Sequence, residues 1–213
     1  MSYKGIIFDL DGVICFTDQY HYQAWKKMAD AIGVYFDEKI NNRLRGVSRM
    51  ASLDIILERS GKNYSRTEKE ALAAQKNEIY KALLHQMTPQ DLSAEVKNTM
   101  DELKRRGYRL AIGSSSKNTK LILERLGLAD YFDAVSDGTN ITHSKPDPEV
   151  FLRAAEYLGL DPADCLVVED ARAGIDAAVA GGFHGAGLGE AAEHEKVTYA
   201  LKSFADLLYV AKR

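Results

Sequence analysis

Cysteine, tryptophan and proline are scarce in this chain, whose 213 residues include two Cys, one Trp and four Pro. Two cysteines cannot support a disulfide-rich scaffold. Cys15 and Cys165 also lack the spacing of metal ligands, so we expect reduced, buried thiols. No apolar run approaches the roughly 20 residues of a membrane span, and we expect no signal peptide or anchor. We therefore expect a cytoplasmic protein with no membrane partner.

The chain also lacks a large excess of basic or of acidic residues. The 28 basic and 31 acidic residues are scattered along the chain and give a formal net charge of -3. This distribution offers no basic stripe for nucleic acid and no polybasic segment for an anionic membrane. With 46% hydrophobic residues, the chain is long enough for one core domain with a sizeable insertion, or for two small domains.

The most informative segment is an apolar run that begins at Gly5 and ends in Asp9 and Asp11. Strands of a parallel sheet are covered on both faces, so carboxylates at the end of such a strand need a partner that offsets their desolvation. A divalent cation suits this role. In an extended chain the two-residue spacing places both side chains on one face, and Gly12 allows a sharp turn. The alternative is a pair of aspartates that cap a turn or bind a structural cation.

Strand-like and helical patterns alternate over most of the chain. The predicted strands are Gly5–Leu10, Tyr108–Gly113, Phe132–Ser136, Cys165–Val168 and His184–Leu188. The predicted helices are Glu95–Arg106, Asn118–Leu126, Pro148–Leu158 and Ala173–Ala180, with stop signals at Gly107, Gly127, Gly159 and Gly181. This alternation predicts an α/β fold with a doubly wound, Rossmann-like parallel sheet, whose ligand site lies at the carboxyl ends of the strands.

Between residues 16 and 88 the alternation stops and only helical periodicity remains. The predicted helices there are Tyr20–Ile32, Asp37–Leu44, Arg49–Ser60 and Arg66–Gln86, with Ser48 and Ser65 as N-caps. We expect residues 1–15 and 89–213 to form a catalytic core. Residues 16–88 would form an inserted, small all-helical cap that closes on substrate and excludes water.

Two further polar motifs lie close to predicted helix starts. Ser114, Ser116 and Asn118 belong to a hydroxyl-rich turn that would suit an anion, although Ser116 or Asn118 fits a simple N-cap equally well. Lys145 lies just before the predicted helix start at Pro148. A lysine in such a position is either solvated or available to stabilise the charge of a transferring phosphoryl group.

A fourth motif places Glu169 and Asp170 at the end of another apolar strand. Together with Asp9 and the backbone carbonyl of Asp11, these acids would complete an oxygen-ligand site of the kind that Mg²⁺ prefers. The four motifs follow one another in order, and the acids and Ser114 each come at the end of a predicted strand. Coincidence is a poor explanation for that arrangement.

In their order and residue types, these motifs resemble the signatures of the haloacid dehalogenase superfamily, whose phosphotransferases form an aspartyl-phosphate intermediate. The insertion resembles the cap of the beta-phosphoglucomutase family in Thr17, residues 20–25, 45–49, 52–53 and 75–77. That resemblance implies a Mg²⁺-dependent phosphomutase that interconverts beta-D-glucose 1-phosphate and glucose 6-phosphate through beta-glucose 1,6-bisphosphate. Its partners would be small-molecule sugar phosphates. A monomer suffices, because the insertion covers the site within one chain.

The resemblance also implies roles for individual residues. Asp9 would be the nucleophile and Asp11 the general acid and base, while Ser114 and Lys145 would contact the transferring phosphoryl group. The implied metal ligands are Asp9, Asp11, Glu169 and Asp170. The implied substrate-binding residues are Thr17, His21, Trp25, Gly46, Val47, Arg49, Ser52, Lys76, Ser116, Lys117 and Asn118.

Other interpretations remain open from the sequence. Without the resemblance, His21 fits a surface or core histidine and Lys76 a solvated helix face. A sugar-phosphate phosphatase with the same core would differ in using water as the acceptor. A sensor without catalysis would have no need for a nucleophile beside its metal. Ala171 and Arg172 depart from the family pattern, but neither is an expected ligand.

Overall fold

The computed structural model describes residues 2–44 and 48–211. The chain divides into two compact units, which are Met1–Phe16 with Thr88–Arg213, and Thr17–Met87. The second unit therefore interrupts the first one in sequence, directly after the first strand.

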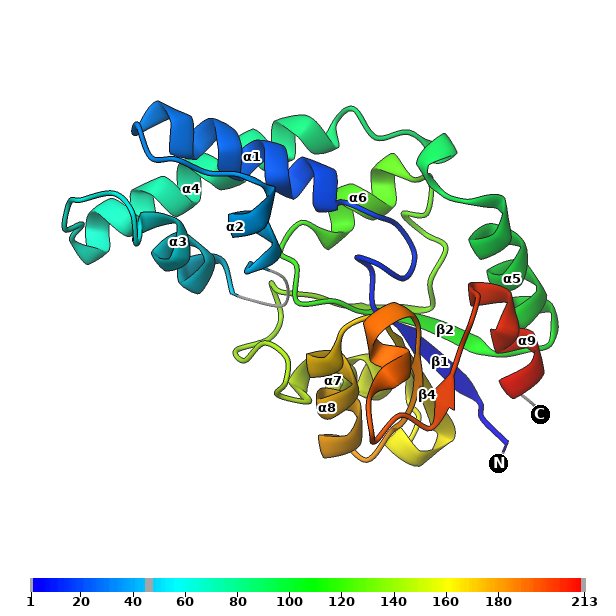
Figure 1. Cartoon of the computed structure of the whole chain (residues 1–213). Coiled ribbons are helices and arrows are strands. Elements are labelled where there is room, and N and C mark those ends of the chain that lie inside the picture. Colours follow the sequence, from blue (N-terminus) through cyan, green and yellow to red (C-terminus); the bar gives the residue numbers. More distant parts are fainter. Residues whose placement is uncertain (1, 45–47, 212–213) are drawn as a thin grey trace. The chain divides into compact units, whose positions relative to one another are not determined.

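A six-stranded sheet, parallel throughout, forms the centre of the first unit (Figure 1). Its strands are β1 (Gly5–Phe8), β2 (Arg109–Gly113), β3 (Ala134–Ser136), β4 (Cys165–Glu169), β5 (His184–Gly187) and β6 (Tyr199–Ala200). The strand order is β3-β2-β1-β4-β5-β6. After β1, the chain adds β2 and β3 on one side of it and then β4, β5 and β6 on the other. The reversal lies between β1 and β4, where open parallel sheets form their ligand sites. The predicted fold class is confirmed.

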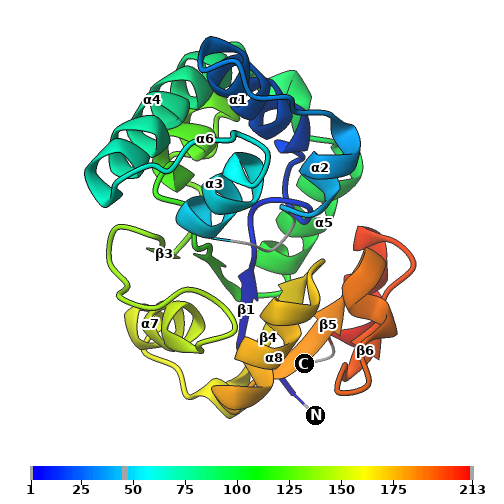
Figure 2. The same ribbon diagram turned by 60° about the vertical axis from the view of Figure 1, so that its left-hand side comes forward.

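Helices cover both faces of this sheet (Figure 2). The helices of this unit are α5 (Ala94–Arg105), α6 (Thr119–Arg125), α7 (Glu149–Leu158), α8 (Arg172–Ala180) and α9 (Leu207–Val210), with short 3-10 turns η1 (Pro89–Asp91), η2 (Pro162–Asp164), η3 (Gly189–Glu193) and η4 (Phe204–Asp206). On one face, Phe151 of α7 and Ala177 of α8 share a buried cluster with Ile7 and Val167. On the other face, the ring of Phe8 stacks on Phe204.

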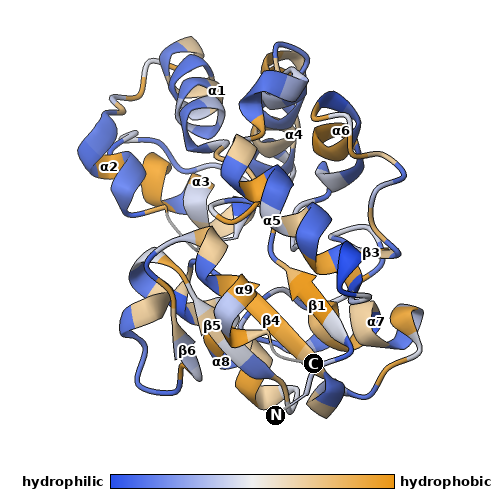
Figure 3. Ribbon diagram, turned by 90° about the vertical axis from the view of Figure 1, so that its right-hand side faces the viewer, coloured by the Kyte–Doolittle hydropathy of each residue, from blue (hydrophilic) through white to orange (hydrophobic). Residues whose placement is uncertain are grey.

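The apolar character of the central strands explains why they lie inside. Every residue of β1 and β4 is buried, and Figure 3 shows both strands coloured as hydrophobic while the helices around them alternate between hydrophilic and hydrophobic residues. Such a pattern is typical of parallel strands that are covered on both faces by amphipathic helices. The polar residues at the strand ends are therefore exceptions that need a cause.

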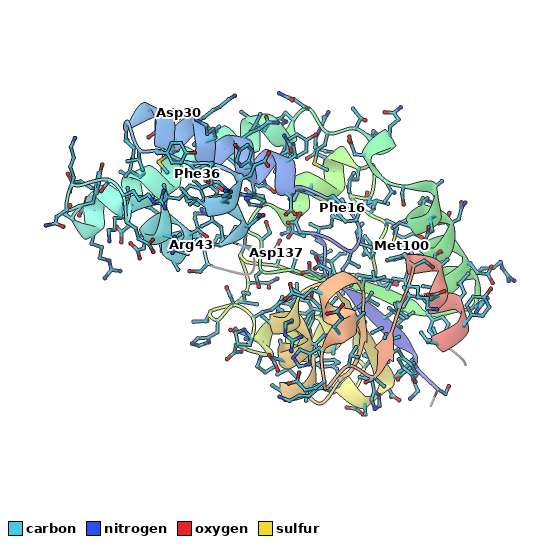
Figure 4. The ribbon with its side chains drawn as sticks, in the orientation of Figure 1. Phe16, Asp30, Phe36, Arg43, Met100 and Asp137 are labelled. Carbon is cyan, nitrogen blue, oxygen red and sulfur yellow. The ribbon has the colours of Figure 1, made fainter. Side chains whose placement is uncertain are left out.

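The second unit contains the helices α1 (Asp18–Ala31), α2 (Glu38–Asn42), α3 (Arg49–Leu57) and α4 (Arg66–Leu84). Their apolar sides form one cluster that includes Trp25, Phe36 and Ile56. Figure 4 shows Phe36 inside this unit and the charged side chains of Asp30 and Arg43 on its outside.

The structure corrects several predicted boundaries. β1 ends at Phe8, two residues before the predicted end at Leu10. The short strand β6 was not predicted, because two residues are too few to show a period. At the end of α8 the positive φ angle belongs to Gly182 and not to Gly181. The N-caps Ser48 and Ser65 are confirmed, since each side chain accepts a backbone N–H bond.

Two expectations about the whole chain can be compared with the structure. Cys15 and Cys165 are both free and buried, as predicted. Within residues 2–44 and 48–211, we find no helix with the length and apolar composition that crossing a bilayer requires.

The N-terminus of α4 provides a test of local stability. Ser65 accepts a hydrogen bond from the Glu68 N–H, and the Glu68 carboxylate accepts one from the Ser65 N–H. Ser65→Ala should lower the free energy of unfolding by about 1 kcal/mol, because helix N–H groups lose their cap. Thermal and urea unfolding would measure the loss. Ser65→Asn, which keeps a capping oxygen, is the control, and an equal loss in both variants would contradict the capping explanation.

Candidate active site

The register of β1 and β4 brings two acids together at the carboxyl edge of the sheet. Phe8 pairs with Val168, so Asp9 and Glu169 are the next residues of neighbouring strands. The Asp9 N–H still donates to the Val168 carbonyl at 2.9 Å. Asp170 follows directly, and ligand oxygens of Asp9, Glu169 and Asp170 all lie within 4.8 Å of one another. The predicted convergence of these three side chains is thus visible in the structure.

Lys145 reaches the same point from the loop that precedes α7. Its Nζ donates to Asp9 Oδ1 at 2.5 Å and to Glu169 Oε1. Only 11% of its side chain is exposed, so the solvated alternative is wrong for this lysine. Burial alone would lower the pKa of Lys145, but the carboxylates of Asp9 and Glu169 outweigh burial and raise that pKa above its ordinary value. The lysine therefore stays protonated at neutral pH.

One ammonium group does not balance three carboxylates. Burial, and then the charge of Glu169, raise the pKa of Asp170 to about 7. Glu169 is fixed further, because its Oε2 accepts the backbone N–H groups of Asp170 and Ala171 at 3.0 Å each. Clustered, partly buried carboxylate oxygens with excess negative charge suit a hard divalent cation. The residues present therefore fit Mg²⁺.

Two glycines leave the room that this cluster needs. Gly12 has a φ angle of +84°, and a Cβ atom there would lie 2.0 Å from Asp170 Oδ2. A Cβ atom at Gly174 would lie 2.0 Å from Glu169 Cδ and 2.1 Å from its Oε1. Gly12 was predicted as a turn residue, whereas the role of Gly174 was missed. A glycine inside the helix α8 was the signal, because glycine is unfavourable there without a packing reason.

Asp11 does not lie where the strand periodicity placed it. Since β1 ends at Phe8, Asp9 and Asp11 are not successive same-face residues of a regular strand. Asp11 instead forms an isolated bridge with Cys15 in the turn that follows. Its carboxylate is not one of the three that converge. The expectation that Asp11 contributes its backbone carbonyl to the metal stays a prediction.

The predicted anion loop leaves the carboxyl end of β2. Ser114 is buried, and its Oγ accepts the Ser116 N–H at 3.2 Å. The Ser116 hydroxyl in turn accepts the Asn118 N–H at 3.2 Å. Asn118 is the N-cap residue of α6, but its side chain makes no capping hydrogen bond, so the simple-cap interpretation is wrong for Asn118. Lys117 is exposed beside them.

The second unit holds a separate polar group of its own. Lys76 Nζ lies 2.8 Å from His21 Nδ1, and the His21 ring stacks on Tyr80 at 4.0 Å. The Tyr80 hydroxyl donates to Thr17 Oγ1 at 2.9 Å, and Lys76 Nζ lies 4.8 Å from the ring centre of Trp25. Burial, followed by the charges of Lys76 and Arg49, lowers the pKa of His21 well below its usual value. Its imidazole is therefore neutral.

The burial of Lys76 decides the open alternative for this residue. Lys76 is only 2% exposed, so the interpretation as a solvated helix face is wrong. Tyr80 was missed, although it follows Lys76 by four residues on one face of α4. Arg49 begins α3 and Ser52 is buried on it. Gly46 and Val47 lie outside the described residues.

Comparisons with known proteins identify the family of this chain and agree with its fold. The model of the family "haloacid dehalogenase-like hydrolase" matches residues 3–182. The chain is 42% identical to beta-phosphoglucomutase of Bacillus subtilis over 88% of this chain and 84% of that protein. It is 35% identical to fructose-1-phosphate phosphatase YqaB of Escherichia coli, over 85% and 94%. The crystal structure of beta-phosphoglucomutase from Clostridium difficile superposes with a TM-score of 0.87 at 37% identity, covering 98% and 95%. The resemblance seen in the sequence is confirmed.

A glycine substitution tests the metal site. In Gly174→Ala the new methyl group would displace the Glu169 carboxylate, and the Mg²⁺ affinity should fall about 10- to 100-fold. Isothermal titration calorimetry measures this affinity. Gly185→Ala is the matched control, since its nearest contact is the terminal Cδ1 atom of Ile175 at 3.0 Å. Equal Mg²⁺ affinity in both variants would disprove the role given to Gly174.

The raised pKa of Asp170 gives a second test. Mg²⁺ must displace the Asp170 proton below pH 7, where that carboxyl is largely protonated in the metal-free protein. The apparent affinity should therefore fall as the pH decreases through 7, by up to about tenfold per pH unit for each proton displaced, and burial raises the pKa of Asp9 as well. Titrations from pH 5.5 to 8.5 in several buffers would also count the protons released. A flat affinity across this range would contradict the assignment.

Proposed function

The chain belongs to the haloacid dehalogenase-like hydrolase family, and on that basis we propose that it is a phosphomutase that interconverts beta-D-glucose 1-phosphate and D-glucose 6-phosphate. The observation that carries phosphoryl transfer, which the mutase shares with its phosphatase alternative, is the Asp9 carboxylate, held by Lys145 beside Glu169 and Asp170 at the carboxyl edge of the sheet. Both kinds of relative support an enzyme that acts on sugar phosphates. The beta-phosphoglucomutase activity is our more specific proposal.

Asp9 would act as the nucleophile. One of its carboxylate oxygens forms a bond to phosphorus while the bond from phosphorus to the sugar oxygen breaks, which gives an aspartyl-phosphate. Asp11 donates a proton to the departing sugar oxygen, and in the next half-reaction it removes one from the attacking hydroxyl. Lys145 and Ser114 donate hydrogen bonds to the phosphoryl oxygens as their charge develops.

Mg²⁺ would be held by Asp9, Asp170, the Asp11 carbonyl and Glu169. When bound there, it supplies positive charge that brings the anionic phosphoryl group and the Asp9 carboxylate together. The chain supplies the rest, because Lys145 holds Asp9 and Glu169 in place and the backbone N–H groups of Asp170 and Ala171 orient Glu169.

We propose that residues 17–87 serve as the cap. Thr17, His21, Trp25, Ser52 and Lys76 would bind the sugar, together with Gly46 and Val47. Arg49 would hold the phosphate that is not reacting, with Ser116, Lys117 and Asn118. A mutase needs such a second phosphate site, because the bisphosphate presents each of its ends in turn to Asp9. The contact between Lys76 and a neutral His21 supports this assignment, since it is a buried polar pair suited to a hydroxyl-rich ligand.

The alternative is a phosphatase for sugar monophosphates, in which water takes the phosphoryl group from Asp9. Relatives of both kinds are similar to this chain. The catalytic acids and Lys145 serve either acceptor equally well. The difference lies in whether a second sugar hydroxyl reaches the aspartyl-phosphate before water does.

A coupled assay distinguishes the two activities. With beta-D-glucose 1-phosphate, Mg²⁺ and a trace of beta-glucose 1,6-bisphosphate, we expect glucose 6-phosphate to form with little inorganic phosphate. Asp9→Asn should reduce turnover by at least about 10⁴-fold and abolish labelling by the bisphosphate, because an amide cannot form the acyl phosphate. Circular dichroism confirms that the variant is folded.

Each other outcome has a distinct meaning. Inorganic phosphate without glucose 6-phosphate would establish the phosphatase and rule out the mutase. Persistent turnover in Asp9→Asn would rule out the aspartyl-phosphate in both. As a control, Asp18→Asn changes an exposed acid at the start of α1 and should leave labelling unchanged.

A further inference from the structure

The ring of Phe151 lies against the catalytic lysine. Lys145 Nζ lies over this ring, 4.6 Å from its centre. Phe151 itself is fully buried on α7, in the cluster that packs this helix against the sheet. A cation over an aromatic face is attracted by the quadrupole of the ring, and the attraction grows when both groups are removed from water. Both conditions hold here, because the Lys145 side chain is only 11% exposed.

The sheet makes room for this ring. A Cβ atom at Gly113 would lie 2.6 Å from Phe151 Cδ1 and 2.9 Å from its Cε1. The glycine that ends β2, directly before Ser114, thus allows the ring to approach the carboxyl edge. Ile7 of β1 lies close to the same point, since its Cγ2 would be 3.1 Å from such a Cβ atom. The position of the ring is therefore determined by β1, β2 and α7 together.

The ring restrains a group that its other contacts leave partly free. Two Lys145 N–H groups donate to Asp9 and Glu169, and both acceptors lie at the carboxyl edge of the sheet. Because a lysine side chain has four rotatable bonds, these two hydrogen bonds alone do not fix its position. A flat apolar surface under the ammonium limits the remaining movement and offers no competing acceptor. In the proposed function, the third N–H group would donate to a phosphoryl oxygen.

We propose that Phe151 is a positioning residue for phosphoryl transfer, whose ring face holds the Lys145 ammonium against Asp9. This inference rests on the proposed function, in which Lys145 contacts the transferring phosphoryl group. It goes further by giving a core phenylalanine an electrostatic role in addition to packing. A residue that only fills space would act through volume, whereas this one acts through the charge distribution of its ring.

Fluorinated phenylalanines separate these two roles. Phenylalanine with one, two or three fluorines keeps its shape closely, while each fluorine weakens the negative face of the ring. Introduced at position 151, this series should lower kcat stepwise, by about tenfold or more at three fluorines, with KM changed less than twofold. The same series at Phe183 is the control, because this ring belongs to the same cluster. It lies edge-on to Phe151, with 6.2 Å between the two ring centres.

A flat kcat across the series at position 151, or an equal decline at position 183, would overturn the proposal. A second measurement is independent of activity. In NMR spectra, the ε-methylene protons of Lys145 should be shifted upfield by the ring current and return toward ordinary values in Phe151→Leu. Lys145→Arg identifies the signals, and thermal unfolding shows whether Phe151→Leu is folded.

The two proposals fail in different ways. If the unmodified protein transfers no phosphoryl group from any sugar phosphate, the proposed function fails, and the NMR shift alone then decides whether Phe151 holds Lys145. If transfer is normal but the Lys145 protons have ordinary shifts, the proposed function stands and the positioning role of Phe151 is wrong.

Discussion

A buried ammonium shared by two carboxylates is the interaction on which the active edge of this protein depends. Removing an ion from water costs several kcal/mol even after relaxation, so acids at the end of buried strands would be unfavourable alone. Lys145 offsets part of this cost by donating to both Asp9 and Glu169. Asp170 remains in excess, as its raised pKa shows. These acids therefore carry more negative charge than Lys145 balances, and a bound cation would stabilise them.

The geometry of a parallel sheet makes such a site possible. Because β1 and β4 pair in register, their apolar residues end at neighbouring positions, Phe8 and Val168. The acids that follow, Asp9 and Glu169, therefore lie side by side. Small residues then become as important as charged ones. Gly12 and Gly174 leave space for the carboxylates, and Gly113 leaves space for the ring beneath Lys145. At each of these glycines a single methyl group would collide with the side chain of Asp170, Glu169 or Phe151.

Much of this arrangement follows from local patterns in the sequence. Apolar runs predict β1, β2, β4 and β5 to within two residues at each end, and the polar residues after them predict which ends carry chemistry. Contacts made by residues that do not lie at strand ends could not be predicted in this way. Lys145 lies 136 positions from Asp9 and 24 from Glu169, and no period in the sequence says that they meet. The same holds for Phe151 beneath Lys145, because a buried helical phenylalanine looks identical whether it packs or also binds a cation.

The choice between mutase and phosphatase depends on groups outside the catalytic cluster. In the proposed mechanism, Asp9, Lys145 and the other two clustered acids would serve the same phosphoryl group whichever oxygen accepts it. In the second unit, Lys76 donates to Nδ1 of a neutral His21, which leaves the proton of the imidazole on Nε2. That arrangement creates a fixed hydrogen-bond donor at the cost of burying an ammonium group. A sugar with several hydroxyl groups offers acceptors for such a donor, whether a second hydroxyl group or water finally takes the phosphoryl group. The buried pair therefore suits a sugar-phosphate substrate, which both activities share.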